Sequence, residues 1–106
     1  MSSITRSGAN DEIVNGAYVH TTITVGTSEV EAKVAGSRLA GRQMLRIYND
    51  SNNTIFIGST GVTISGTTKG EPLVKGNWIN IPVGDATPVY LIAGSAGNNI
   101  IVSEWA

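Results

Sequence analysis

Residues 42–58 read RQMLRIYNDSNNTIFIG, and this stretch decides the fold class. Side chains two positions apart on a strand point to the same face of a sheet. One predicted face holds four aliphatic side chains, Leu45, Ile47, Ile55 and Ile57. The other predicted face holds Met44, Arg46, Tyr48 and Phe56. Residues 50–53, DSNN, are typical turn formers. The stretch therefore predicts a β-hairpin that packs one face and contains no reactive chemistry.

Patterns of the same kind recur on both sides of this stretch. Further strands are expected at residues 18–25, 28–34, 61–65, 78–83, 88–93 and 98–104. The first two are expected to pair as a hairpin that turns at Gly26 and Thr27. Val62 and Ile64 are expected on one face, and Pro82 marks a strand that lies at a sheet edge or ends there. No eleven-residue window shows the 3.6-residue period of a helix.

About eight short strands with turn signals about every 8 to 12 residues predict an all-β fold, an antiparallel β-sandwich. A jelly roll is one candidate topology, and a small closed barrel is the alternative architecture. Residues 1–17 are polar and lack a period, which predicts an extended N-terminal arm. Residues 18–106 are then a single β-sandwich domain. Within the arm, Ile13 and Val14 are the adjacent apolar pair, and we expect them to contact a partner.

The surface of this domain is expected to carry little charge. Asp, Glu, Lys and Arg make up 14% of the chain, against about 25% in typical soluble domains. The formal net charge of -1 gives no electrostatic footprint for nucleic acid or an anionic membrane. Hydroxyl and amide groups are easier to desolvate than ions, and they repel an approaching strand less. We therefore expect protein partners and a homo-oligomer, without nucleic acid or membrane.

Residues with catalytic or ligand-binding potential are few and scattered. His20 is the only histidine and cysteine is absent, so a zinc site would need an unusual ligand set. No GxSxG elbow, Walker loop or dinucleotide fingerprint occurs. We predict no catalytic residue, no metal and no cofactor. A hydrolase, a third possibility, would need a pocket with converging polar groups. With no apolar leader segment in the sequence, a soluble cytosolic product is expected.

Aromatic residues are the remaining candidates for binding: Tyr18, Tyr48, Phe56, Trp78, Tyr90 and Trp105. As cross-strand neighbours, Tyr48 and Phe56 would form a platform for stacking on a sugar or for contact with another subunit. Trp105, next to the C-terminus, either folds back on its own sheet or enters a neighbour. The candidate partner contacts are Ile13, Val14, Tyr48, Phe56, Trp78 and Trp105.

Between Gly41 and Glu104 the chain resembles a group of small bacteriophage virion proteins. The matching pieces are GRQMLRIYNDSNNTIFIGSTGVT, KGEPLVKGNWINIP and PVYLIAGSAGNNIIVSE. Members of that group carry a GR, a T-I-x-I-G strand, a GVT, a G-x-PL-x-x-G turn and a closing V-Y-x-I-A with an acidic end. Asn77 and Trp78 depart from the pattern, because an acidic and a small residue are more common there.

This resemblance implies a non-enzymatic structural protein of the virion, assembled in the host cytoplasm. The first expectation is a capsid decoration or head accessory protein that stabilises the particle by contacts with the major capsid protein. The alternative is a neck or tail module that binds a receptor or a carbohydrate, with Tyr48, Phe56 or Trp78 as stacking groups.

Overall fold

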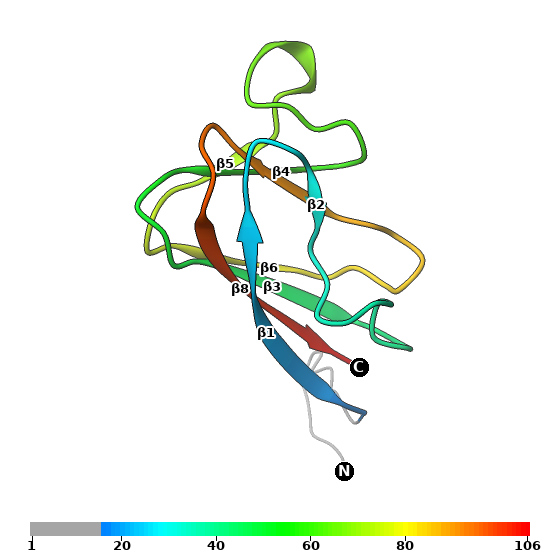
Figure 1. Ribbon diagram of the computed structural model, residues 1–106. Helices are drawn as coiled ribbons and strands as arrows, with labels where there is room; N and C mark the ends of the chain where they lie inside the picture. The colour runs from blue at the N-terminus through cyan, green and yellow to red at the C-terminus, as the bar shows by residue number, and fades with distance from the viewer. Residues whose placement is uncertain (1–15) are drawn as a thin grey trace.

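Two four-stranded sheets pack face to face in the computed structural model, which describes residues 16–106 (Figure 1). Sheet A holds, in spatial order, β1 (Tyr18–Val25), β8 (Asn98–Trp105), β3 (Met44–Asn49) and β6 (Trp78–Ile81). Sheet B holds β2 (Val30–Glu31), β7 (Tyr90–Ala93), β4 (Ile55–Gly58) and β5 (Glu71–Leu73). All strand pairs in both sheets are antiparallel. The predicted antiparallel β-sandwich of eight strands is confirmed, and this strand order is that of a jelly roll.

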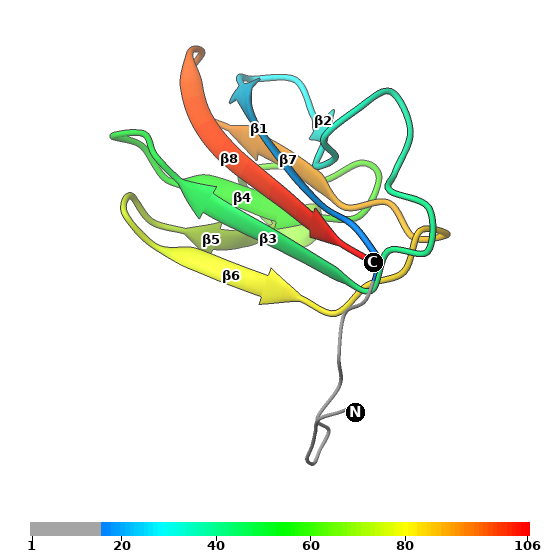
Figure 2. The same cartoon turned by 90° about the horizontal axis from the view of Figure 1, so that it is seen from below.

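Figure 2 shows the two sheets as separate layers, and the core lies between them. There the alternating aliphatic side chains of both sheets meet. Its fully buried members come from six segments: Val25, Ala32, Leu45, Ile47, Ile55, Leu91, Ala93, Ile100 and Val102. Strand β3 shows the alternation most clearly, with every second residue buried. The four aliphatic residues predicted to share a face do all point into this core. They do so from opposite sheets, because β3 belongs to sheet A and β4 to sheet B.

The predicted hairpin at residues 42–58 is therefore wrong. Strand β3 pairs with β6 and β8, whereas β4 pairs with β5 and β7. Residues 50–54 form the corner where the chain crosses from one sheet to the other. The predicted hairpin of 18–25 with 28–34 is wrong for the same reason, since β1 pairs with β8 and β2 with β7. Alternation of apolar and polar residues predicts which side chains point inward. A hairpin within one sheet and a crossover between two sheets produce the same alternation, so the pattern could not distinguish them.

Individual strands differ in how well their bounds were predicted. The prediction for β1 is confirmed at both ends, and Pro82 does follow an edge strand, β6. In place of the 28–34 strand only Val30–Glu31 is a strand. Residues 61–65 form no strand; Val62 is buried and Ile64 is 42% exposed, so they do not share a face. This segment instead leads into a 3₁₀ turn, η2 (Gly66–Thr68).

Within residues 16–106, η2 is the one helical segment. No helix in this range is long and apolar enough to cross a membrane.

Candidate functional site

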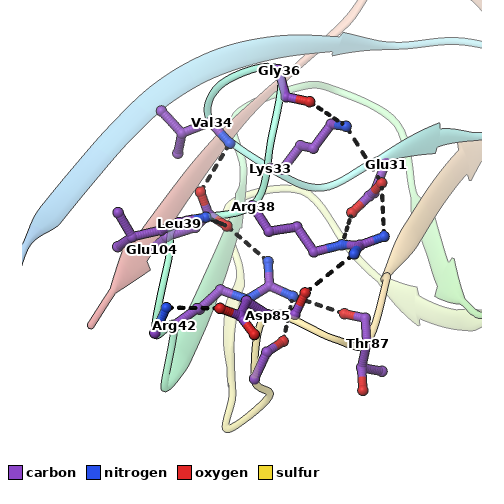
Figure 3. Close-up of polar contacts among 12 residues, drawn as sticks. Glu31, Lys33, Val34, Gly36, Arg38, Leu39, Arg42, Asp85, Thr87 and Glu104 are labelled. Atoms are coloured by element: carbon purple, nitrogen blue, oxygen red, sulfur yellow. Dashed lines mark hydrogen bonds and ion pairs between the residues drawn. The ribbon is translucent and has the colours of Figure 1, made fainter.

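A buried ion pair is the most polar feature inside the sandwich. Arg42 and Glu104 are 3% and 1% exposed, and Arg42 Nη1 lies 2.8 Å from Glu104 Oε2. Backbone N–H groups of Val34 and Leu39 donate to the same carboxylate at 3.1 and 3.3 Å. Arg42 Nη2 donates to the carbonyls of Gly84 and Thr87 (Figure 3). Both charges are thus occupied in joining strand ends and loops, which makes this cluster structural.

A second ion pair lies beside the first (Figure 3), and its side chains are more exposed. Arg38 Nε donates to Glu31 Oε2 at 2.5 Å, and Lys33 Nζ lies 3.6 Å from Glu31 Oε1. Arg38 also donates to the Asp85 carbonyl, and the Asp85 carboxylate accepts the Gly41 N–H at 2.8 Å. These bonds fasten the loop before β3 to the loop after β6. The glutamates and arginines of this end therefore support the fold.

The buried amide side chains of Asn49 and Asn98 also join strand ends and loops. The Asn49 Nδ2 group donates to the carbonyls of Asn53 and Leu73, both at 2.8 Å. Asn98 Nδ2 donates to the carbonyls of Val25 and Ser95. Among the described residues, no group of three His, Cys, Asp or Glu side chains could hold a metal ion. His20 is exposed on β1, with its ring stacked 5.6 Å from that of Tyr18.

The outer face of sheet A, on the side away from the core, gathers most of the aromatic residues. Directly opposite residues of paired strands share a face, so the strand registers arrange this face in rows. One row is Tyr18, Trp105 and Met44. A parallel row is Thr22, Ile101, Tyr48 and Trp78. Four of the six aromatic residues of the chain thus lie on one face of one sheet.

Between these rows runs a polar row, His20, Ser103, Arg46 and Asn80. The Arg46 guanidinium lies 4.3 Å from the Trp78 ring centroid, a cation–π arrangement. The Tyr18 and Trp105 rings lie 4.8 Å apart. Met44, Arg46, Asn80 and Trp105 line a shallow hollow of about 260 Å³ in this face. Among outward-facing strand residues of sheet A, Arg46 is the one fixed charge, so the face combines aromatic rows and uncharged polar side chains with little charge.

Three of the predicted contact residues come together on this face. Tyr48 and Trp78 are directly opposite each other on β3 and β6, and Trp78 is 53% exposed. Trp105 is the last residue of β8 and packs on its own sheet against Tyr18, the first of its two predicted arrangements. The contacts predicted for Ile13 and Val14 lie outside the described residues.

Phe56 does not join them. It lies on β4, opposite Pro72 and Ile92 on the outer face of sheet B, with Lys69 Nζ 5.6 Å from its ring centroid. The predicted platform of Tyr48 and Phe56 is therefore wrong, because the two side chains point away from opposite sheets. The sequence correctly placed Met44 on one face with Arg46 and Tyr48, but Ile101 was missed as a member of the outer face. The alternation on β8 was visible, but grouping Ile101 with the residues of β3 requires the strand order.

A second surface feature is an apolar groove of about 450 Å³ at the open side of the sandwich, where β6 faces β4. Ile57, Ile79, Ile81, Val83 and Val89 contribute its aliphatic lining, and Glu71 is its charged residue.

No protein-family model matches the chain, and no curated protein is significantly similar to it.

Proposed function

We propose that this protein is a non-enzymatic structural component of a bacteriophage virion, a capsid decoration or head accessory protein. The observation that carries the proposal is the outer face of sheet A, with two aromatic rows and one fixed charge. Tyr, Trp, Met and Arg are the residues enriched in the buried centres of protein interfaces. Jelly rolls occur in viral capsid proteins, in lectins and elsewhere, so the fold supports the proposal by analogy alone.

Attachment would act by burial of this face against the capsid shell. Each copy removes apolar area from water and desolvates few charges, so each contact is favourable without ion pairing. Repetition over the symmetric sites of a shell adds these contacts together. Because the face carries little charge, attachment is expected to depend weakly on salt. Release of the protein from purified particles at moderate salt, with retention at low salt, would contradict this mechanism.

The experiment compares two faces of the same molecule. Trp78→Ala removes an exposed aromatic from the outer face of sheet A, and Phe56→Ala removes one from the outer face of sheet B as a matched control. Co-sedimentation with shells that lack the protein measures both affinities. We expect Trp78→Ala to weaken attachment by about 30-fold, as for an interface hot spot of about 2 kcal/mol. Phe56→Ala is expected to attach like the unaltered chain. Equal affinities for the two variants would overturn the proposed face.

A second candidate is a tail or neck module that binds carbohydrate. Trp78 favours it, because this ring is half exposed, lies opposite Tyr48 and has Arg46 stacked on it. Such rings stack on the apolar faces of sugars. A glycan array separates the two functions: specific binding that Trp78→Ala abolishes would favour the tail module. Copy number also separates them, since decoration implies hundreds of copies per particle and tail fittings come in small multiples of three or six.

A further inference from the structure

The four sheet edges of this sandwich are not alike. Natural β proteins keep edges from pairing with foreign strands by making them short or by placing proline, lysine or a bulge on them. Three edges follow that rule. Strand β2 has two residues, β5 has three including Pro72, and β6 has four and is followed by Pro82. The fourth edge, β1, breaks it.

Strand β1 is an eight-residue edge, YVHTTITV, without proline, lysine or any fixed charge. Its register with β8 runs through eight successive pairs with no bulge. The backbone hydrogen bonds of residues 16–106 connect β1 to β8 alone along this length, so its other side offers a row of donors and acceptors. The other three edges are protected against pairing and β1 is not. Strand β1 therefore has the features of a strand that pairs with another strand.

Side-chain burial on β1 gives an independent indication. Val19, Thr21 and Ile23 point toward the core but are only half buried, whereas Ile100 and Val102 of the neighbouring β8 are 0% exposed. A strand added beside β1 would cover these three inward side chains. Among the residues that the structure describes, the edge thus has no backbone partner and incomplete apolar cover on the same side.

We propose that the partner is β1 of a second copy, paired antiparallel across a two-fold axis, so that two A sheets become one of eight strands. The strand suits itself as a partner because it carries no fixed charge to repel its copy. Its residues are mostly β-branched, the type that packs best in cross-strand pairs. Such a dimer places both outer faces on the same side, as one continuous surface. The pairing does not depend on what that surface contacts.

The geometry restricts the register. Directly opposite residues must point to the same face, so the numbers of paired residues must add to an even sum. The two registers of this kind that pair β1 over most of its length place either Thr21 or Thr22 on the two-fold axis, opposite its own copy. With Thr22 on the axis, Val19 faces Val25 and Thr21 faces Ile23 on the core side, while His20 faces Thr24 on the outer side.

The first test uses charge. Sedimentation equilibrium of the full chain should show a dimer. Thr22→Lys and Thr22→Glu should each raise the dimer dissociation constant by about tenfold or more, because like charges then meet at the axis. An equimolar mixture of the two should restore dimers. Thr60→Lys, which adds the same charge at an exposed turn, should leave the dimer intact. Circular dichroism of each variant checks that it is folded.

The second test uses crosslinking, since the chain has no cysteine of its own. Under mild oxidation, Thr21→Cys or Thr22→Cys should form a disulfide dimer about tenfold or more faster than Thr60→Cys, because pairing gives the axial thiols a high effective concentration. A chain that stays monomeric at every concentration overturns the proposal. So does a dimer that tolerates Thr22→Lys as well as Thr60→Lys and shows no preferred crosslink.

Discussion

Arg42 and Glu104 show how single residues fix this fold. Arg42 lies just before β3 and Glu104 near the end of β8, and the hydrogen bonds of their ion pair reach the loops at residues 34–39 and 84–87. Arg42 Nε has no hydrogen-bond partner among the described residues. Removing two ions from water is costly, and such a pair adds little stability of its own. Its role is to specify which loops meet at this end of the sandwich.

Removal of one partner of the ion pair is therefore expected to lower the free energy of unfolding more than replacement of both partners. Arg42→Met leaves the Glu104 carboxylate buried without its counter-ion and should lower the free energy of unfolding by about 3–5 kcal/mol. Adding Glu104→Gln removes the unpaired charge and keeps an amide oxygen for the Val34 or Leu39 N–H. Urea unfolding should show the double variant to be more stable than Arg42→Met alone. A double variant as unstable as the sum of both single changes would contradict this interpretation.

At the scale of elements, the corner between β3 and β4 separates a sandwich from a hairpin. Asn49 ends β3 fully buried, and its backbone bonds to Gly76 and Asn77 tie the corner to the turn before β6. Its side chain holds Asn53 and Leu73, while its Oδ1 accepts from the Ser51 N–H and hydroxyl. This buried amide thus fixes the corner by bonding it to the end of β5.

Asn49→Ala is expected to lower the free energy of unfolding by about 2–3 kcal/mol, because two carbonyls lose their donor. Asn52→Ala, at an exposed position of the same corner, should change it by no more than about 0.5 kcal/mol. Thermal unfolding of both variants measures the difference. Equal effects would mean that the corner is held by turn propensity and not by the buried amide.

Close backbone approach fixes the β4–β5 connection as well. A Cβ on Gly70 would lie 2.7 Å from the Ile57 carbonyl oxygen and 2.8 Å from the Ile57 nitrogen. Gly70→Ala should therefore destabilise the protein by about 1–3 kcal/mol. At Gly36 a Cβ meets no atom within 4 Å, so Gly36→Ala serves as the control and should be nearly neutral. Chemical unfolding of the two variants side by side tests this, and a neutral Gly70→Ala would contradict the packing.

At the scale of elements, the sequence alone could predict which residues are buried but not which strands pair. Alternation placed Leu45, Ile47 and Ile55 in the core, because burial of one strand face is a local pattern. It could not choose strand partners, since a hairpin and a crossover between sheets bury the same residues. One signal in the sequence was not used in predicting the fold: Asn49 is a polar amide at an inward-facing position of β3. The short β2 was overestimated because residues 28–34 alternate although only two of them bond to β7.

At the scale of the whole molecule, the candidate surface arises only when distant strands come together. Tyr18, Tyr48, Trp78 and Trp105 belong to four different strands, and the jelly-roll order β1-β8-β3-β6 brings all four to one face. Composition indicated a weakly charged surface suited to burial, and individual aromatics could be named from the sequence. That Phe56 lies on a different face from these four residues could not be predicted, because it follows from the crossover between sheets at residues 50–54. The account at this scale rests on that face being covered by protein.

Hydroxyl-radical footprinting of the aromatic side chains, in the isolated chain and in purified particles, measures this coverage most directly. The account predicts that Tyr48 and Trp78 are oxidised readily in the isolated chain and strongly protected in the particle, while Phe56 on the opposite face changes little. Equal oxidation of Trp78 in both samples, or protection confined to Phe56, would contradict it.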